Sequence, residues 1–171
     1  LFKKSLKDFF SVKLEDVIPD AKLPILPSRE NCHSIIFVTE DSYKTKIGFQ
    51  EYEIKPSQAL IIQAGAVFSV EHINKRLKGF TCHFHPNTLI GKFGNRSLIS
   101  EFEFLNIGNH PIIDIKESSK SPILNIFKRL ATEFENDNNP NIIHAYLYTL
   151  LTELKILAGE SNSVKQGASY Q

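Results

Sequence analysis

Short apolar runs, each ended by polar or turn-forming residues, fill the chain between positions 35 and 85. The runs follow one another about every 8–12 residues, and no helical periodicity separates them. This spacing predicts a sandwich or small barrel of short strands rather than a sheet with crossover helices. The predicted strands cover residues 35–39, 44–49, 52–54, 59–62, 67–72 and 80–85.

The pattern becomes helical in the second half of the chain. Ser121-Pro122 and Asn139-Pro140 each place a capping side chain before a proline, which is a helix start signal. Apolar residues then recur at spacings of three and four in both segments, and the polar run of residues 135–138 separates them. Gly159 is expected to end the second helix. We therefore predict an antiparallel helical hairpin over residues 118–159.

The second predicted helix carries an apolar stripe whose role the sequence leaves open. The stripe has the spacing of a coiled coil, so it fits a contact between two copies of the chain or a seam within the hairpin. A homodimer through this stripe is one prediction, and an intra-hairpin seam is the other. The stripe consists of Ile143, Leu147, Leu150, Leu154 and Leu157.

The two ends of the chain lack such periodicity. Residues 1–30 contain three prolines and are predicted to form an arm or irregular lead-in, with one short strand as an alternative, ahead of the β-rich part, residues 31–117. Residues 160–171 are rich in Ser, Gly and Gln and are predicted to be a linker toward a further domain.

Composition narrows the classes of function. The 171 residues carry 20 Lys and Arg against 19 Asp and Glu, so the chain lacks the basic excess of a typical DNA-binding domain. No apolar run reaches the ~20 residues of a membrane span, and the first residues do not follow a signal-peptide pattern. With only two cysteines and no CxxC spacing, we expect a cytoplasmic protein without a disulfide framework or a membrane partner.

His83 and His85 are the strongest candidates for chemistry. Two positions apart on a predicted strand, they share one face, and paired imidazoles can ligate zinc, iron, nickel or copper. A metal-dependent enzyme is therefore an alternative function, in which His72 or His33 would complete the site. The favoured interpretation is that the intervening residues form core while the histidines meet solvent or a polar cavity. It predicts no metal, no cofactor and no catalytic residue.

Aromatic side chains of the predicted strands are candidates for a ligand pocket. Ligand sites are mostly apolar with a few polar groups, and four phenylalanines occupy positions that a hollow barrel would turn inward. A small barrel can also be filled with side chains, which would leave a module that only dimerises. The predicted pocket residues are His33, Phe37, Phe49, Phe68, His72, His83, Phe84 and His85.

The order of these parts resembles the sensor half of AraC-family transcription regulators. The similarity lies in His33, in residues 37–40, 47–56 and 60–65, and in the segment from Gly79 to Pro86 with Leu89 after it. The helical hairpin is similar to the one through which AraC-type sensor domains dimerise. The resemblance covers about residues 30–158.

The resemblance implies a β-rich α+β fold, in which a cupin-like β-barrel of the jelly-roll type precedes the helical hairpin. It also implies a bacterial regulator with a small-molecule effector in the barrel, a homodimer, and DNA binding through a helix-turn-helix domain absent from this sequence. Metal-binding cupins carry an H-x-H pair in their first motif and another histidine in their second. Here no such pair follows His33, and Phe68 lies near the second-motif position. The resemblance therefore implies an effector-binding cupin without catalysis.

Overall fold

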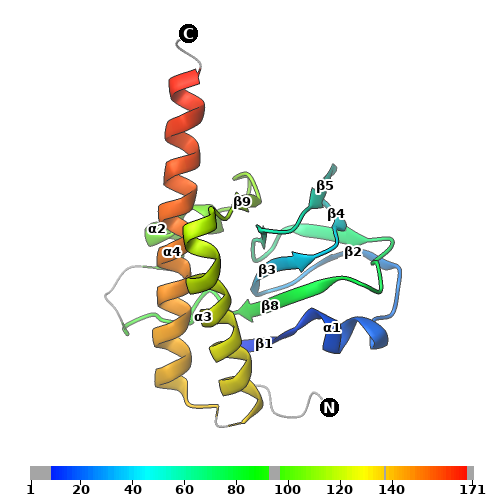
Figure 1. Cartoon of the computed structure of the whole chain (residues 1–171), viewed down its shortest axis with the longest axis horizontal. Coiled ribbons are helices and arrows are strands. Elements are labelled where there is room, and N and C mark those ends of the chain that lie inside the picture. Colours follow the sequence, from blue (N-terminus) through cyan, green and yellow to red (C-terminus); the bar gives the residue numbers. More distant parts are fainter. Residues whose placement is uncertain (1–8, 93–96, 137, 169–171) are drawn as a thin grey trace.

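The computed structural model describes residues 9–92, 97–136 and 138–168 of the chain. Two antiparallel sheets face each other, and two long helices pack on one side of them (Figure 1). The predicted fold class, a cupin-like β-rich α+β fold followed by a helical hairpin, is confirmed. In the described part of the chain the strands form two sheets rather than one closed barrel.

The five-stranded sheet lies between the other sheet and the helices, with the strand order β1-β8-β3-β6-β9. Its neighbouring strands are all antiparallel, and the register places Phe37 of β3 between Ala59 of β6 and Phe80 of β8. The strands are β1 (Phe9–Lys13), β3 (His33–Glu40), β6 (Gln58–Ile62), β8 (Lys78–Phe84) and β9 (Ile112–Asp114).

The four-stranded sheet has the order β2-β7-β4-β5. A two-residue turn joins β4 to β5, and its Gly48 has a φ angle of 62°, which glycine adopts without steric cost. The strands are β2 (Ile25–Arg29), β4 (Tyr43–Ile47), β5 (Gln50–Ile54) and β7 (Val67–Val70).

The five-stranded sheet is buried on both faces, which explains why its strands read as nearly continuous apolar runs. Side chains alternate along β3, so that Ile35 and Phe37 face the helices while Val38 faces the other sheet. A cluster of buried side chains occupies the space between the sheets, and we call it the inter-sheet cluster. It consists of Leu14, Val38, Tyr43, Ile54, Leu60, Ile62, Val70 and Leu77.

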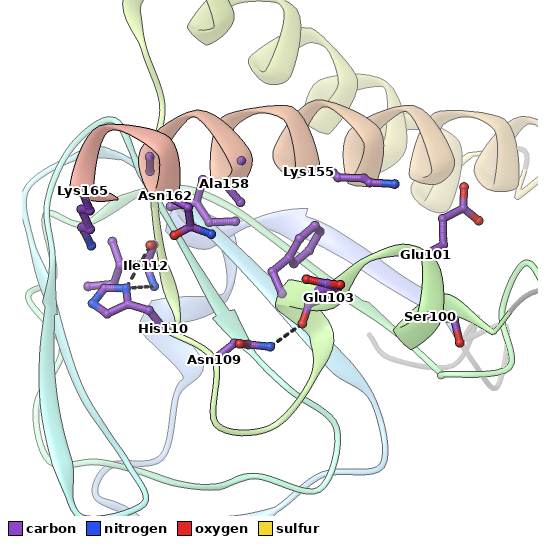
Figure 2. Close-up of a pocket in the computed structure, with 14 residues that line it drawn as sticks. Ser100, Glu101, Glu103, Asn109, His110, Ile112, Lys155, Ala158, Asn162 and Lys165 are labelled. Carbon is purple, nitrogen blue, oxygen red and sulfur yellow. Dashed lines mark hydrogen bonds between the residues drawn. The ribbon is translucent and has the colours of Figure 1, made fainter. Parts of the chain in front are cut away.

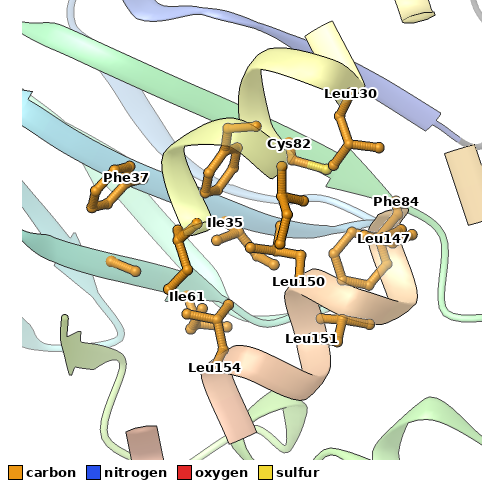
Figure 3. Close-up of a cluster of buried hydrophobic side chains, with 14 of the residues drawn as sticks. Ile35, Phe37, Ile61, Cys82, Phe84, Leu130, Leu147, Leu150, Leu151 and Leu154 are labelled. Atoms are coloured by element: carbon orange, nitrogen blue, oxygen red, sulfur yellow. The ribbon is translucent and has the colours of Figure 1, made fainter. Parts of the chain in front are cut away.

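The helical hairpin covers the other face of this sheet. It consists of α3 (Glu117–Glu135) and α4 (Pro140–Ala168), and α4 extends beyond α3 (Figure 1). Figure 3 shows Leu130 of α3 and Leu151 of α4 packed around Cys82 and Phe84 of β8. We call this larger group the sheet–helix cluster.

The apolar stripe of α4 lies within this cluster. Four of its side chains are fully buried, and Leu157 is 3% exposed, because the single chain covers them with α3 and the sheet. The prediction that the stripe forms a dimer contact is therefore wrong, and these residues form the seam within the chain. The four fully buried residues are Ile143, Leu147, Leu150 and Leu154.

The predicted arm, residues 1–30, contains two strands of the sheets. β1 pairs with β8, and β2 pairs with β7. The short helix α1 (Leu14–Val17) and the 3-10 turn η1 (Ile18–Asp20) connect the two strands. The prediction of an arm is wrong for this part because pairing with long strands outweighs the weak local pattern. Residues 1–8 lie outside the described residues.

The predicted linker, residues 160–171, is helical as far as Ala168. Gly159 does not end α4, since a glycine inside a helix costs only about 1 kcal/mol relative to alanine and the packing of the preceding turns outweighs this cost. Residues 169–171 lie outside the described residues. None of the described helices combines the length and apolar content that a membrane crossing requires.

Candidate functional site

The predicted pocket residues do not come together around one cavity. Phe37 and Phe84 belong to the sheet–helix cluster, whereas Phe68 packs against the inter-sheet cluster. Phe49 is fully exposed at the β4–β5 turn, and His72 lines a separate polar groove beside β4 and β5. The alternation of side chains along the strands distributes these residues over opposite faces, so they do not form the predicted pocket.

His83 is held by two hydroxyl groups on the face of β8 opposite the helices. Its Nδ1 lies 2.9 Å from Ser34 Oγ, and its Nε2 lies 3.2 Å from Thr81 Oγ1. The ring of Phe10 packs edge-on against it, with 5.5 Å between ring centroids. Burial lowers the pKa of His83 to about 4, so the imidazole is neutral at pH 7.

His33 lies on the helix-facing side of the same sheet, at the start of β3. Its Nδ1 accepts a hydrogen bond from the backbone N–H of Ala64 at 2.9 Å, and its ring packs on Phe84. Burial lowers the pKa of His33 to about 4, and the nearby His85 adds a smaller lowering effect. His33 and His83 therefore both have a lowered pKa, and they lie on opposite faces of the same sheet.

The histidines proposed as metal ligands have separate partners. The Nδ1 atom of His85 accepts a hydrogen bond from the backbone N–H of Asn87 at 3.1 Å, while both ring nitrogens of His83 lie next to hydroxyl groups. Within residues 9–92, 97–136 and 138–168, no three or more His, Cys, Asp or Glu side chains are placed to hold a metal ion.

A groove of about 460 Å³ lies between α4 and the segment that leads from α2 (Leu98–Glu101) through the 3-10 turn η2 (Glu103–Leu105) to β9 (Figure 2). This volume falls within the range of small-molecule sites. We call it the α4 groove. It is lined by Ser100, Glu101, Glu103, Phe104, Asn109, His110, Ile112, Ile113, Lys155, Ala158, Gly159, Ser161, Asn162 and Lys165.

One wall of the α4 groove is a single face of α4. Lys155, Ala158, Gly159, Asn162 and Lys165 recur at spacings of three and four, which places them on the same side of a helix. A Cβ atom added at Gly159 would meet no atom within 4 Å. The glycine therefore leaves open space in the groove at a modest cost in helix stability.

The opposite wall is anchored to the five-stranded sheet. β9 pairs with β6, and the buried side chain of Gln63 donates a hydrogen bond to the backbone oxygen of Phe104 at 3.1 Å. The side-chain amide of Asn109 donates to the backbone oxygen of Glu103 at 2.6 Å and closes the loop between η2 and β9 (Figure 2). Strand pairing and a side-chain hydrogen bond therefore fix this wall to the sheet.

Side chains at one end of the groove join its two walls. The Tyr148 hydroxyl of α4 donates a hydrogen bond to the Glu101 carboxylate, and this bond raises the pKa of Tyr148. The ring of Phe102 packs edge-on against Tyr148, and Lys155 Nζ lies 5.8 Å from the centroid of the same ring. These contacts tie α4 to the sheet-anchored wall.

The sequence-based prediction missed this groove. Its walls come from two segments that are far apart in the sequence, residues 100–113 and 155–165, and β9 is only three residues long. The sequence offered one signal of this groove: Lys155, Ala158 and Asn162 have the spacing of a single helix face, next to the buried stripe. The expectation that the helix ends at Gly159 concealed the rest of this face.

Comparisons with known proteins identify the fold. No model of a protein family matches this sequence, and no curated protein sequence matches it at a significant level. Several solved structures do resemble it. The structure of ToxT from Vibrio cholerae O395 bound to (E)-4-(8-methylnaphthalen-1-yl)but-3-enoic acid matches with a TM-score of 0.50 and 10% identity. That match covers 87% of this chain and 57% of ToxT, so the chain spans little more than half of that protein's length.

Two further structures show weaker likeness. The AraC-like transcriptional activator CuxR matches with a TM-score of 0.49 and 9% identity, over 89% of this chain and 49% of CuxR. The cupin domain of Cnp3 from Schizosaccharomyces pombe matches with a TM-score of 0.38 and 14% identity, over 57% of this chain and 70% of that domain. The match to ToxT confirms, at the level of the fold, the resemblance found in the sequence.

Proposed function

We propose that this chain is the effector-sensing and dimerisation domain of a bacterial AraC-type transcription regulator, with no catalytic step of its own. The observation that carries the proposal is the position of the α4 groove, which has α4 as one wall and a sheet-anchored segment as the other. The fold likeness to ToxT supports it, because that structure has a small organic acid bound. The inter-sheet cluster fills the space where the sequence predicted the effector, so the effector is assigned to the α4 groove.

A ligand in the α4 groove contacts both walls at once. It therefore stabilises those positions of α4, relative to the sheet, in which both sets of contacts form. A ligand can shift such an equilibrium only by its difference in affinity for the two positions. In this mechanism the shift of α4 is transmitted to a DNA-binding domain outside this sequence.

A second stripe on α4 offers a surface for dimerisation. Ile142, Tyr146, Thr149, Glu153 and Ile156 recur at spacings of four and three, and the ring of Tyr146 is 37% exposed while Ile156 is 52% exposed. Apolar side chains in this pattern favour packing against a helix of a second copy. The homodimer proposed here therefore uses this exposed stripe in place of the buried one.

Sedimentation of the variant Ile156→Lys tests the dimer. We expect the wild-type chain to sediment as a dimer and the variant as a folded monomer, because a lysine buried in the contact between two helices is left unpaired. Ile107→Lys is the matched control, since Ile107 is 64% exposed on the loop before β9 and lies outside the stripe. A dimer that persists in Ile156→Lys would contradict this surface.

Native mass spectrometry of the purified chain tests the function. The proposal predicts a metal-free dimer that carries a dissociable small molecule or accepts one. Stoichiometric iron, nickel or zinc on a monomer, lost in a His83→Ala/His85→Ala double variant, would instead support a metal-dependent cupin enzyme. A dimer in which no compound binds the groove would support a module that only dimerises.

A further inference from the structure

The end of the α4 groove next to β9 presents hydrogen-bond donors. His110 Nδ1 lies 3.3 Å from the backbone nitrogen of Ile112 and 3.2 Å from its oxygen. When Nδ1 accepts the hydrogen bond from the Ile112 N–H, Nε2 carries the N–H that can donate to a ligand. The side chains of Lys165 and Asn162 extend from α4 at the same end (Figure 2). Among the described residues, none forms an ion pair with Lys165.

The opposite end of the groove carries two carboxylates. Glu101 already accepts a hydrogen bond from Tyr148, whereas the Glu103 carboxylate has no ion-pair or hydrogen-bond partner within the described part of the chain. Lys155 also lies at this end, over the Phe102 ring, so two negative charges face one positive charge. The groove is therefore positive at the Lys165 end and negative at the Glu103 end.

The centre of the groove has an apolar lining and an open shape. Phe104 and Ala158 supply apolar surface, and Gly159 leaves space where a side chain would otherwise project. Lys155 and Lys165 are ten positions apart, which corresponds to about 15 Å along the helix axis. This length favours an elongated ligand over a compact one.

We infer that the α4 groove selects an elongated zwitterionic small molecule, with its carboxylate at Lys165, Asn162 and His110 and its ammonium group at Glu103. The inference rests on the proposed function, since it names the class of effector for the same groove. Charge-assisted hydrogen bonds at both ends would fix the direction of the ligand. A ligand bound in this direction has its carboxylate on α4 and its ammonium group on the sheet-anchored wall, so it bridges the two walls.

The test uses three probes with the same ten-carbon chain: 10-aminodecanoate, decanoate and decylamine. Binding to the full ¹⁵N-labelled chain is measured from amide chemical shifts. We expect 10-aminodecanoate to bind most tightly and to shift amides of residues 103–112 and 155–165. Lys165→Gln should weaken the binding of 10-aminodecanoate and of decanoate by about tenfold, because a hydrogen bond to a charged group is lost. Glu103→Gln should weaken the binding of 10-aminodecanoate by about tenfold and leave that of decanoate unchanged.

Lys128→Gln is the control, since Lys128 is exposed on α3 and does not line the groove. Equal binding of decanoate and 10-aminodecanoate, unchanged binding of the probes to the Lys165→Gln variant, or no saturable shift with 10-aminodecanoate would each overturn the inference. Gly159→Leu separates this failure from that of the proposed function. If it abolishes probe binding while the charge variants have no effect, the groove remains the effector site and only the zwitterion assignment fails.

Discussion

Both faces of the five-stranded sheet are buried, but different elements cover them. On the face toward the other sheet, the inter-sheet cluster closes the space with aliphatic side chains and Tyr43, and His83 sits between two hydroxyl groups. On the face toward the helices, the sheet–helix cluster is larger, and the α4 groove opens beside it.

This difference indicates a division of labour between the faces. On the face toward the second sheet, the side chains of the inter-sheet cluster fill the space between the two sheets. On the face covered by the helical hairpin, the α4 groove lies at the boundary between α4 and the segment anchored to the sheet. In the proposed function, a ligand bound at this boundary changes the position of the helix relative to the sheet.

The largest expected effect is on the helix face. Leu150→Asp places an unpaired charge at a fully buried position, which costs more than about 4 kcal/mol. We expect the chain to lose its cooperative unfolding transition, measured by circular dichroism in urea. Asn125→Asp is the control, because Asn125 is exposed on α3 and lies outside both stripes of α4. A folded Leu150→Asp chain would show that the stripe is not the seam.

Acid should lower the free energy of unfolding through one histidine on each face of the sheet. The pKa of His33 and of His83 is lowered from 6.5 to about 4, so the unfolded chain binds protons in this window while the folded chain does not. Stability is therefore present at pH 7 and falls as the pH drops from 6.5 toward 4. The loss amounts to about 3 kcal/mol for His33 and less for His83, which is only partly buried.

Single variants assign this acid effect to the two faces. His33→Gln should remove the contribution of the helix face, and His83→Gln should remove that of the sheet face. The measurement is urea unfolding at pH 7 and pH 4.5 for each variant and for the wild type. A His33→Gln/His83→Gln double variant with the pH dependence of the wild type would contradict this origin.

A smaller loss of stability is expected from a substitution at the turn of the hairpin. The buried carboxylate of Glu133 accepts hydrogen bonds from Arg129 and from the backbone N–H of Asn139, both at 3.1 Å, so it fixes how α4 leaves α3. Glu133→Gln should lower the free energy of unfolding by about 2 kcal/mol, because the charge-assisted bond to Arg129 is lost. Glu135→Gln, at an exposed position, serves as the control. Equal stability of the two variants would remove this role from Glu133.

The smallest effect on stability is expected in the α4 groove itself. Gly159→Leu introduces a side chain into open space and improves helix propensity, so the melting temperature should stay unchanged or rise slightly. Its effect should appear as loss of ligand binding, measured by amide chemical shifts. Gly159→Ala fills less of the groove and should retain binding. A destabilised Gly159→Leu would show that the groove is closed in solution.

The sequence predicted the parts whose local pattern agrees with their packing. The strict alternation of residues 80–85 indicated β8, and the heptad spacing of the stripe indicated a hairpin. The sequence allowed one short strand in residues 1–30 but did not locate β1 or β2, because β1 is short, Pro27 interrupts the pattern of β2, and their pairing with β8 and β7 is non-local. The groove could not be predicted, since His110 and Lys165 meet only through the packing of β9 and α4.

The location of the effector site can be measured by amide chemical-shift mapping of the ¹⁵N-labelled chain against a panel of small organic acids, amines and zwitterions. We predict that compounds with saturable binding shift amides of residues 100–113 and 155–165, the two walls of the α4 groove. Shifts centred on Val38, Leu60 and Val70 would contradict this assignment, because they would place the ligand between the sheets.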